Sequence, residues 1–431
     1  DPWAGELPVP RPRLNPYSRQ DSIDPQPVVS LRDGAPGPDL RPSNLSQRPG
    51  GPRGQILYAV QNNARSVVVS ANPDGTGGRV LLATLEENHC PVWSPDRSQV
   101  ALAQLNSAPS GAPAIPGENS SGELAPGRVE DQPFADGIFI LDPDSGKLRE
   151  VSTPDGVPGV SQRFGRSTYG CPAWSPTSVE GGPYVAALVD MGRERFLALF
   201  PAGQAGILPG QPAQARYVSL GRAGEWSQPV WSSDGRKILM LRAGSYGAPP
   251  GLRVVYVPDD PEAPLAGVHF LGSWGSRAVS ELAIAPDGKM LVELEGIGVA
   301  QTAHLHRINR SSRFGNNSVS SAVQLDPPAQ TIEAGRLAWI NANTFGVILR
   351  GGPADAFKSM FYLYNIETNI ARPLLMFGDS VNSASWSPDG RWLIFRAESG
   401  LWGLDVARAV LGTDEIPVWL SPQPVQDLDW K

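Results

Sequence analysis

Few side chains of this sequence have the types and spacing that catalysis or metal binding requires. There are four histidines, and His304 and His306 alternate, so on a strand both would lie on one face. Two imidazoles could bind a zinc ion, but zinc sites need at least a third protein ligand, and the sequence offers none nearby. No nucleophile elbow, zinc-protease motif, P-loop or dinucleotide fingerprint occurs. We therefore predict no catalytic, cofactor-binding or metal-binding residues and a protein that is not an enzyme.

The two cysteines, Cys90 and Cys171, each stand three residues before a tryptophan. A disulfide between them would join two neighbouring repeats of the chain. Matched side chains on neighbouring repeats point the same way, however, and a disulfide needs Cα atoms within about 7 Å of each other. This argument favours two buried free thiols and leaves the disulfide as the alternative.

Both cysteines belong to a stretch that recurs along the chain, and its fullest copy spans residues 383–396, SASWSPDGRWLIFR. Ser-Pro-Asp-Gly favours a type I turn, in which Pro388 presets φ and Gly390 takes the left-handed conformation that follows. The apolar run from Trp392 to Phe395 is typical of a strand that is buried on both faces. The stretch therefore predicts a strand, a tight turn and a second strand.

The residue before the turn is tryptophan in all copies but one, where it is isoleucine. A leucine or proline mostly precedes it by two residues on the same strand face, so we expect these side chains in the core between sheets and not in a sugar or cofactor site. Their spacings of 81, 57, 53, 55, 47 and 44 residues suit the four-stranded blades of a β-propeller. The residues are Trp93, Trp174, Trp231, Ile284, Trp339, Trp386 and Trp430.

The repeated Pro-x-Trp-Ser-Pro-Asp-Gly with its apolar strand resembles the TolB-type, WD40-like (PD40) repeat of bacterial β-propellers. It is also similar to the propeller domains that precede the catalytic domain of prolyl-oligopeptidase-like peptidases. The copies around Trp174 and Trp339 depart from the turn consensus. The resemblance covers about residues 55–431 and implies an all-β propeller of a kind that mostly serves as a platform for other proteins.

The two ends of the propeller predict how the ring closes. Three apolar strands follow Gln55 with no tryptophan strand before them, whereas residues 425–430 are a tryptophan strand without its own partners. We predict that both segments share one blade, because a closed ring leaves no exposed sheet edge. Counting the tryptophan positions then gives seven blades, with six or eight as alternatives because the copy around Ile284 is weak.

We divide the chain into a Pro-rich arm, residues 1–53, and a propeller, residues 54–431. The arm has 12 prolines and few apolar residues, so it cannot bury enough surface to fold alone. We predict that it runs extended over a partner subunit with Trp3 and Tyr17 as anchors; lying along its own propeller is the alternative. Segments 106–137 and 154–170 should emerge on one face of the ring and contact other subunits as well.

The residues matched to the cysteines in the other repeats vary in charge, which predicts a polar channel mouth. They are Gln228, Glu281, Arg336, Ser383 and Asp427. All of them except the serine are candidates for interaction with a partner.

Charge and hydropathy argue against a nucleic-acid partner and against a transmembrane segment. The net charge is −7 and no basic stripe is present, which argues against nucleic acid. No apolar run approaches the 18 residues that a transmembrane helix needs. The sequence starts at Asp1 without methionine, as a mature chain does once its signal peptide is removed, so we expect an extracytoplasmic protein in the periplasm or at the cell surface.

These features together predict a non-catalytic exported propeller that acts as a scaffold or accessory subunit of a larger surface- or membrane-associated assembly. Two alternatives remain open. One is a protein that binds a ligand, peptide or glycan at the channel mouth. The other is a propeller hydrolase or lactonase with a metal or an acidic pair in the channel.

Overall fold

The computed structural model describes residues 51–430 with gaps at 63–64, 106–134, 153–156, 158–166, 177–181, 192–193, 204–214, 223–225, 243–250, 261–262, 274–278, 286–289, 296–300, 308–318, 326–331, 352–358, 380, 388, 398, 411–416 and 422–424. The arm residues Trp3 and Tyr17 and most of segments 106–137 and 154–170 lie outside the described residues. In the described part of the chain, no helix is long and apolar enough to cross a membrane.

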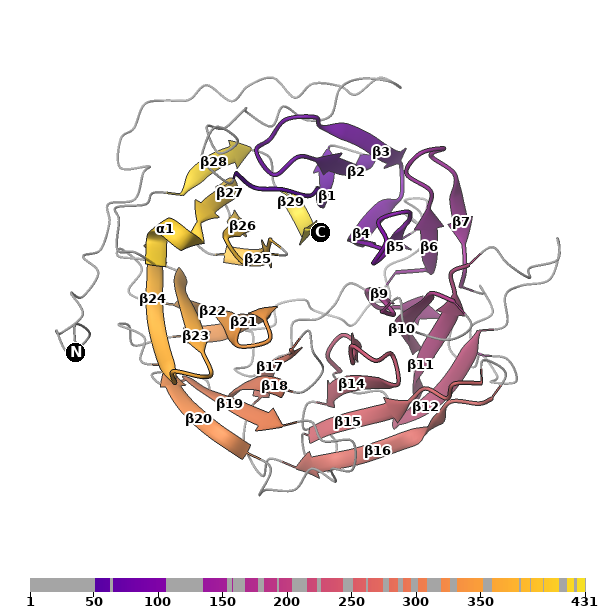
Figure 1. Cartoon of the computed structure of the whole chain (residues 1–431). Helices are drawn as coiled ribbons and strands as arrows, with labels where there is room; N and C mark the ends of the chain where they lie inside the picture. The colour runs from indigo at the N-terminus through magenta and orange to yellow at the C-terminus, as the bar shows by residue number, and fades with distance from the viewer. Residues whose placement is uncertain are drawn as a thin grey trace, which may run out of the picture.

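Antiparallel sheets follow one another around a ring, each with its innermost strand toward the centre (Figure 1). The sheet that closes the ring has the order β29 (Val425–Trp430), β1 (Ile56–Asn62), β2 (Arg65–Ala71) and β3 (Arg79–Thr84). Next come β4 (Glu87–Trp93), β5 (Val100–Leu105), β6 (Gly137–Leu141) and β7 (Leu148–Glu150). A five-stranded sheet follows, with β8 (Thr168–Tyr169), β9 (Ala173–Trp174), β10 (Tyr184–Asp190), β11 (Glu194–Pro201) and β12 (Arg216–Arg222).

The remaining four sheets complete the ring, and each pairs its strands in chain order. They are β13 (Val230–Trp231), β14 (Lys237–Arg242), β15 (Gly251–Tyr256) and β16 (Ala266–Ser273); then β17 (Val279–Ile284), β18 (Met290–Glu295), β19 (Gln301–Arg307) and β20 (Val319–Leu325). After them come β21 (Ile332–Asn341), β22 (Thr344–Gly351), β23 (Ser359–Asn365) and β24 (Ile370–Phe377), and finally β25 (Val381–Trp386), β26 (Trp392–Ala397), β27 (Gly400–Asp405) and β28 (Val418–Ser421). A five-residue helix, α1 (Val406–Val410), follows β27.

The ring closes as the sequence predicts. Strand β29 pairs antiparallel with β1, so that Trp430 lies opposite Ile56 and Leu428 opposite Tyr58. The all-β propeller is thus confirmed, and the weak copy around Ile284 is a complete four-stranded sheet. Six sheets have the four strands of a regular blade. The sheet around Trp174 is irregular because two two-residue strands, β8 and β9, both pair with β10.

The tight turn of the repeat forms as expected from its residue types. At the fullest copy, the N–H of Gly390 donates to the carbonyl of Ser387 at 2.8 Å, and Gly390 has a φ of +68°. The hydroxyl of Ser387 accepts the backbone N–H of Trp392, the first residue of the second strand, at 2.9 Å. Asp389 then accepts the serine O–H at 2.6 Å and the N–H of Arg391 at 3.1 Å. Local hydrogen bonds therefore define the hairpin before any packing is considered.

The second strand of this repeat is buried on both faces, as its apolar run predicts. Trp392 and Ile394 belong to the core cluster shared with the closing sheet, whereas Leu393 and Phe395 belong to the cluster shared with the preceding sheet. All four side chains are at most 1% exposed. The core of the molecule is therefore a series of apolar layers between neighbouring sheets.

Candidate functional site at the inner rim of three sheets

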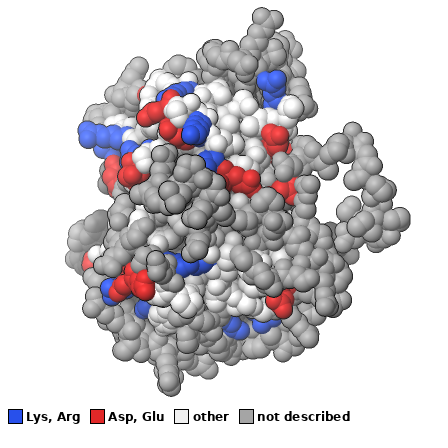
Figure 2. All heavy atoms as spheres, turned by 90° about the vertical axis from the view of Figure 1, so that its right-hand side faces the viewer, with Lys and Arg blue, Asp and Glu red and all other residues white. Residues whose placement is uncertain are grey.

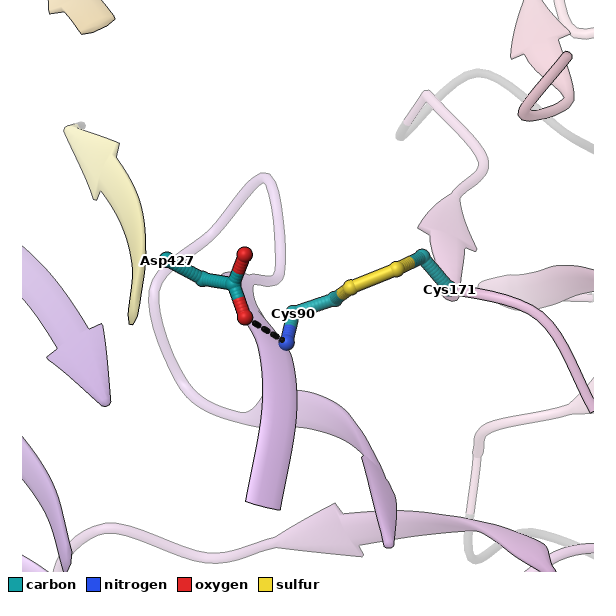
Figure 3. The surroundings of a disulfide bond; sticks show 3 residues. All are labelled: Cys90, Cys171 and Asp427. Carbon is teal, nitrogen blue, oxygen red and sulfur yellow. Dashed lines mark hydrogen bonds between the residues drawn. A yellow bond between two sulfur atoms is a disulfide. The ribbon is translucent and has the colours of Figure 1, made fainter. Parts of the chain in front are cut away.

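Cys90 connects three neighbouring sheets at the inner rim of the ring (Figure 3). Its backbone N–H donates to Oδ2 of Asp427 on β29 at 2.7 Å, and its sulfur is bonded to that of Cys171, just before β9. A second carboxylate on β29, that of Asp429, accepts the backbone N–H of Trp93 through Oδ2 at 2.9 Å. We call the region around these five residues the inner rim.

The disulfide shows why the argument for free thiols fails. The Cα atoms of Cys90 and Cys171 are 5.5 Å apart, within the range that a disulfide spans. Cys90 has a φ of +51° and lies where the β4–β5 register shifts between His89 and Val92, so its side chain does not follow the regular alternation of a strand. The favoured expectation of two free thiols is therefore wrong, because it assumed regular strand geometry at both cysteines.

The four predicted interaction residues of the channel mouth lie in different surroundings. The carboxylate of Asp427 is committed to the neighbouring sheet by its hydrogen bond to Cys90, and Gln228 is exposed. Glu281 and Arg336 lie on β17 and β21, and their side chains are outside the described residues. Asp429 was not predicted, although its alternation with Asp427 on one face of the last strand was visible in the sequence.

Three of the repeated tryptophans also hydrogen-bond from one sheet to the next. The indole Nε1 of Trp174 donates to the carbonyl of Val92 at 3.0 Å, and Val92 directly precedes Trp93 in the neighbouring sheet. Equivalent indole hydrogen bonds join Trp231 to the carbonyl of Ala173 at 3.1 Å and Trp339 to the carbonyl of Ala283 at 3.0 Å. Isoleucine has no such donor, so Ile284 cannot form this bond.

Two turn aspartates, Asp96 and Asp234, have pKa values below their usual range. Hydrogen bonds from the Ser94 hydroxyl and the Ser98 N–H keep the pKa of Asp96 below its usual range. Burial raises the pKa of Asp234, but hydrogen bonds from Ser232 and from the N–H of Arg236 outweigh burial and lower it. These carboxylates therefore stabilise turns.

The described surface shows no single dominant charge. Basic and acidic side chains are intermixed over the described part of the face in Figure 2. Among the described residues, no group of three or more histidine, cysteine, aspartate or glutamate side chains is arranged to hold a metal ion. The side chains of His304 and His306 on β19 lie outside those residues.

Comparisons with known proteins identify the fold. No family model matches the chain, and no curated protein sequence matches it. Among solved structures, the periplasmic gluconolactonase of Pseudomonas aeruginosa is 16% identical with a TM-score of 0.53, covering 88% of this chain and 98% of that one. A candidate 6-phosphogluconolactonase from Bacteroides uniformis is 12% identical with a TM-score of 0.54, covering 88% and 99%. TolB from Acinetobacter baumannii is 14% identical with a TM-score of 0.44, covering 90% and 68%, a score too low to carry an argument.

These neighbours correct one prediction. The expectation that the chain is not an enzyme is overturned, because propellers with the same fold include proteins named as lactonases. At 12–16% identity the likeness concerns the fold alone and assigns no reaction to this chain. The resemblance to TolB-type repeats agrees with the propeller fold, while membership of that repeat family remains a prediction.

Proposed function

We propose that the chain acts outside the cytoplasm as a protein-interaction platform, that is, as a scaffold or accessory subunit of a larger surface- or membrane-associated assembly. The observation that carries this proposal is the inner rim, where Cys90 links three sheets through a covalent bond and a charge-assisted hydrogen bond. A rigid surface loses little conformational entropy when a partner binds, so more of the contact energy appears as affinity.

The disulfide supports the proposed location. Disulfides persist in oxidising compartments such as the periplasm and the cell surface, and thiol-reducing systems keep them rare in the cytosol. Cys90 and Cys171 are 8% and 2% exposed, so the bond is shielded and suits a structural role.

The proposal also includes the number of blades, the class of the repeat and the segments that contact other subunits. We count the irregular five-stranded sheet as a blade, which gives seven, and we assign the repeats to the TolB-type PD40 class on their turn motif. The Pro-rich arm, residues 1–53, and the segments 106–137 and 154–170 would contact the other subunits.

Co-purification of the full chain from the cell envelope of its own host tests the proposal. The tagged chain should recover defined subunits after cross-linking, each of these subunits, tagged in turn, should recover the chain, and deletion of residues 1–53 should reduce recovery. A monodisperse monomer that recovers no subunit in either direction would contradict the platform function. Hydrolysis of gluconolactones by the purified chain, measured separately, would instead favour the lactonase alternative.

A further inference from the structure

The two histidines of β19 are paired with a strand that carries a carboxylate. His304 and His306 alternate on β19, and the backbone register places Glu293 of β18 opposite His304 and Leu291 opposite His306. Residues directly opposite each other on paired strands lie on the same face of the sheet, so both histidines and Glu293 share one face. Strand pairing therefore supplies the third ligand that the sequence does not show close to the histidines.

The three positions are neighbours on that face. Glu293 is directly opposite His304, a relation that places Cβ atoms about 4.5–5.5 Å apart, and diagonal to His306, a relation of about 7–8 Å. The two histidines are two residues apart on one strand, which corresponds to about 7 Å. Histidine and glutamate side chains are long enough to converge on one ion from positions spaced in this way.

The equivalent positions of another sheet belong to the apolar core. The Pro-Asp-Gly that precedes both β18 and β26 aligns the two sheets residue by residue, and their registers agree over the aligned pairs. The three equivalent residues of the sheet β25–β28 are apolar, at most 4% exposed, and part of the core cluster shared with the preceding sheet. They are Phe395, Trp402 and Leu404. Ionisable residues are kept at core positions when they are paired or bind a metal ion, so this exchange needs a functional reason.

The other face of the same two strands keeps the apolar pattern. Val292 and Leu305 are paired, 0% exposed, and belong to the core cluster shared with the sheet β21–β24. The strands therefore alternate regularly, and their ionisable residues lie on the face toward the preceding sheet, β13–β16. Leu291, on that same face, is also 0% exposed.

We propose that His304, His306 and Glu293 bind a zinc ion between the sheet β17–β20 and the sheet β13–β16. Two imidazoles and one carboxylate form a zinc ligand set that leaves the fourth position to water. An ion that is captured as the chain folds is enclosed when the two sheets pack, so the site needs no open pocket.

The zinc site replaces the expectation of no metal-binding residue, which considered only ligands close to the histidines in the sequence. It shares no residue with the inner rim, so it stands or falls independently of the platform function.

Metal binding by the untagged full chain tests the site. The chain is stripped with EDTA, freed of the chelator and titrated with Co²⁺ or Zn²⁺. We expect Co²⁺ to give the visible d–d absorption of a four-coordinate complex, which saturates at one ion per chain and is abolished by Zn²⁺. Zn²⁺ should also raise the melting temperature, because it binds the folded chain. Mg²⁺ and Ca²⁺ should not raise it, because they prefer oxygen ligands.

Single substitutions then identify the ligands. Loss of an outer-shell partner costs a metal site about 10- to 100-fold in affinity, so loss of a direct ligand in His304→Ala should weaken Zn²⁺ binding at least about a hundredfold. Glu293→Gln, which keeps the shape of the side chain, should weaken it as well. His89→Ala is the matched control, because it removes a histidine from a different sheet, on β4, and should leave the Zn²⁺ affinity unchanged.

Circular dichroism of the EDTA-treated chains shows whether each variant folds; if His304→Ala does not, Glu293→Gln decides. The proposal is wrong if the stripped native chain takes up no Zn²⁺, or if His89→Ala alone loses Zn²⁺ binding. It is also wrong if the folded variant that decides binds Zn²⁺ as tightly as the native chain.

Discussion

The indole Nε1 of Trp174 donates a 3.0 Å hydrogen bond to the carbonyl oxygen of Val92, the residue before the equivalent tryptophan of the neighbouring sheet. Trp174 therefore fills the apolar layer between two sheets and also ties their innermost strands together. The same relation recurs where a repeat carries tryptophan at Trp231 and Trp339. At these three positions the double role explains why tryptophan suits the site better than another large apolar residue.

Substitutions of Trp174 should separate the two roles. Trp174→Phe keeps an aromatic ring but leaves the Val92 carbonyl without its donor, so we expect a loss of about 1–2 kcal/mol in the free energy of unfolding. Trp174→Ala also removes the packing and should cost about 3–5 kcal/mol. Urea unfolding followed by circular dichroism measures both. Equal stability of Trp174→Phe and the native chain would show that the hydrogen bond contributes nothing.

The repeat and the ring closure could be predicted because they depend on local patterns. Turn residues such as Gly390 and the alternation of apolar residues act over a few positions, and the tryptophan spacing reveals the repeat. The contacts of the inner rim could not be predicted, because they depend on irregular backbone. The positive φ of Cys90 and the two short strands β8 and β9 reorient side chains in a way that no alternation rule describes.

Asp427 should stabilise the closure of the ring. Its carboxylate accepts the Cys90 N–H, and Asp427→Ala would leave that donor without its acceptor, at a cost of about 1–3 kcal/mol. Asp427→Asn keeps a neutral acceptor and should cost less. Asp144→Asn is the control, because its ion pair with Arg79 is exposed, with the Asp144 side chain 95% accessible, and should change stability by less than about 1 kcal/mol. A cost at Asp427 no larger than at Asp144 would contradict the assignment.

The disulfide should stabilise the folded chain by restricting the unfolded one. It closes a separation of 81 residues, so the Cys90→Ala, Cys171→Ala double variant should lose about 2–4 kcal/mol. Thermal unfolding of the native chain and the double variant, both without reductant, measures the difference. Thiol titration of the denatured, unreduced native chain provides the control: two reactive thiols would show that the bond does not form.

Gly390 should be intolerant of a side chain for two separable reasons. Its φ of +68° disfavours any other residue, and an added Cβ would lie 1.9 Å from Cγ2 of Ile340 in the neighbouring sheet. Gly390→Ala should therefore cost about 2–4 kcal/mol. Gly146→Ala is a matched control with the same φ and no atom within 4 Å of the added Cβ, so it should cost only about 1–2 kcal/mol. In a double-mutant cycle, the Gly390→Ala, Ile340→Ala double variant should lose less free energy of unfolding than the two single variants lose together. A loss equal to that sum would exclude the clash.

The turn aspartates should make stability fall in acid. The pKa values of Asp96 and Asp234 are lowered in the folded chain, so their contribution is fully present above the unfolded pKa of about 4 and is lost as the pH falls through the lower folded values. Melting temperatures measured between pH 6 and pH 2.5 should therefore fall below about pH 4. The double variant Asp96→Asn, Asp234→Asn should melt lower at pH 6 and show a smaller fall, because amides do not titrate. Ser94→Ala, which removes a hydrogen bond to the Asp96 carboxylate, should raise the pKa of Asp96 in a carbon-detected NMR titration. If the native chain and the double variant lose the same melting temperature on acidification, other groups control the acid response.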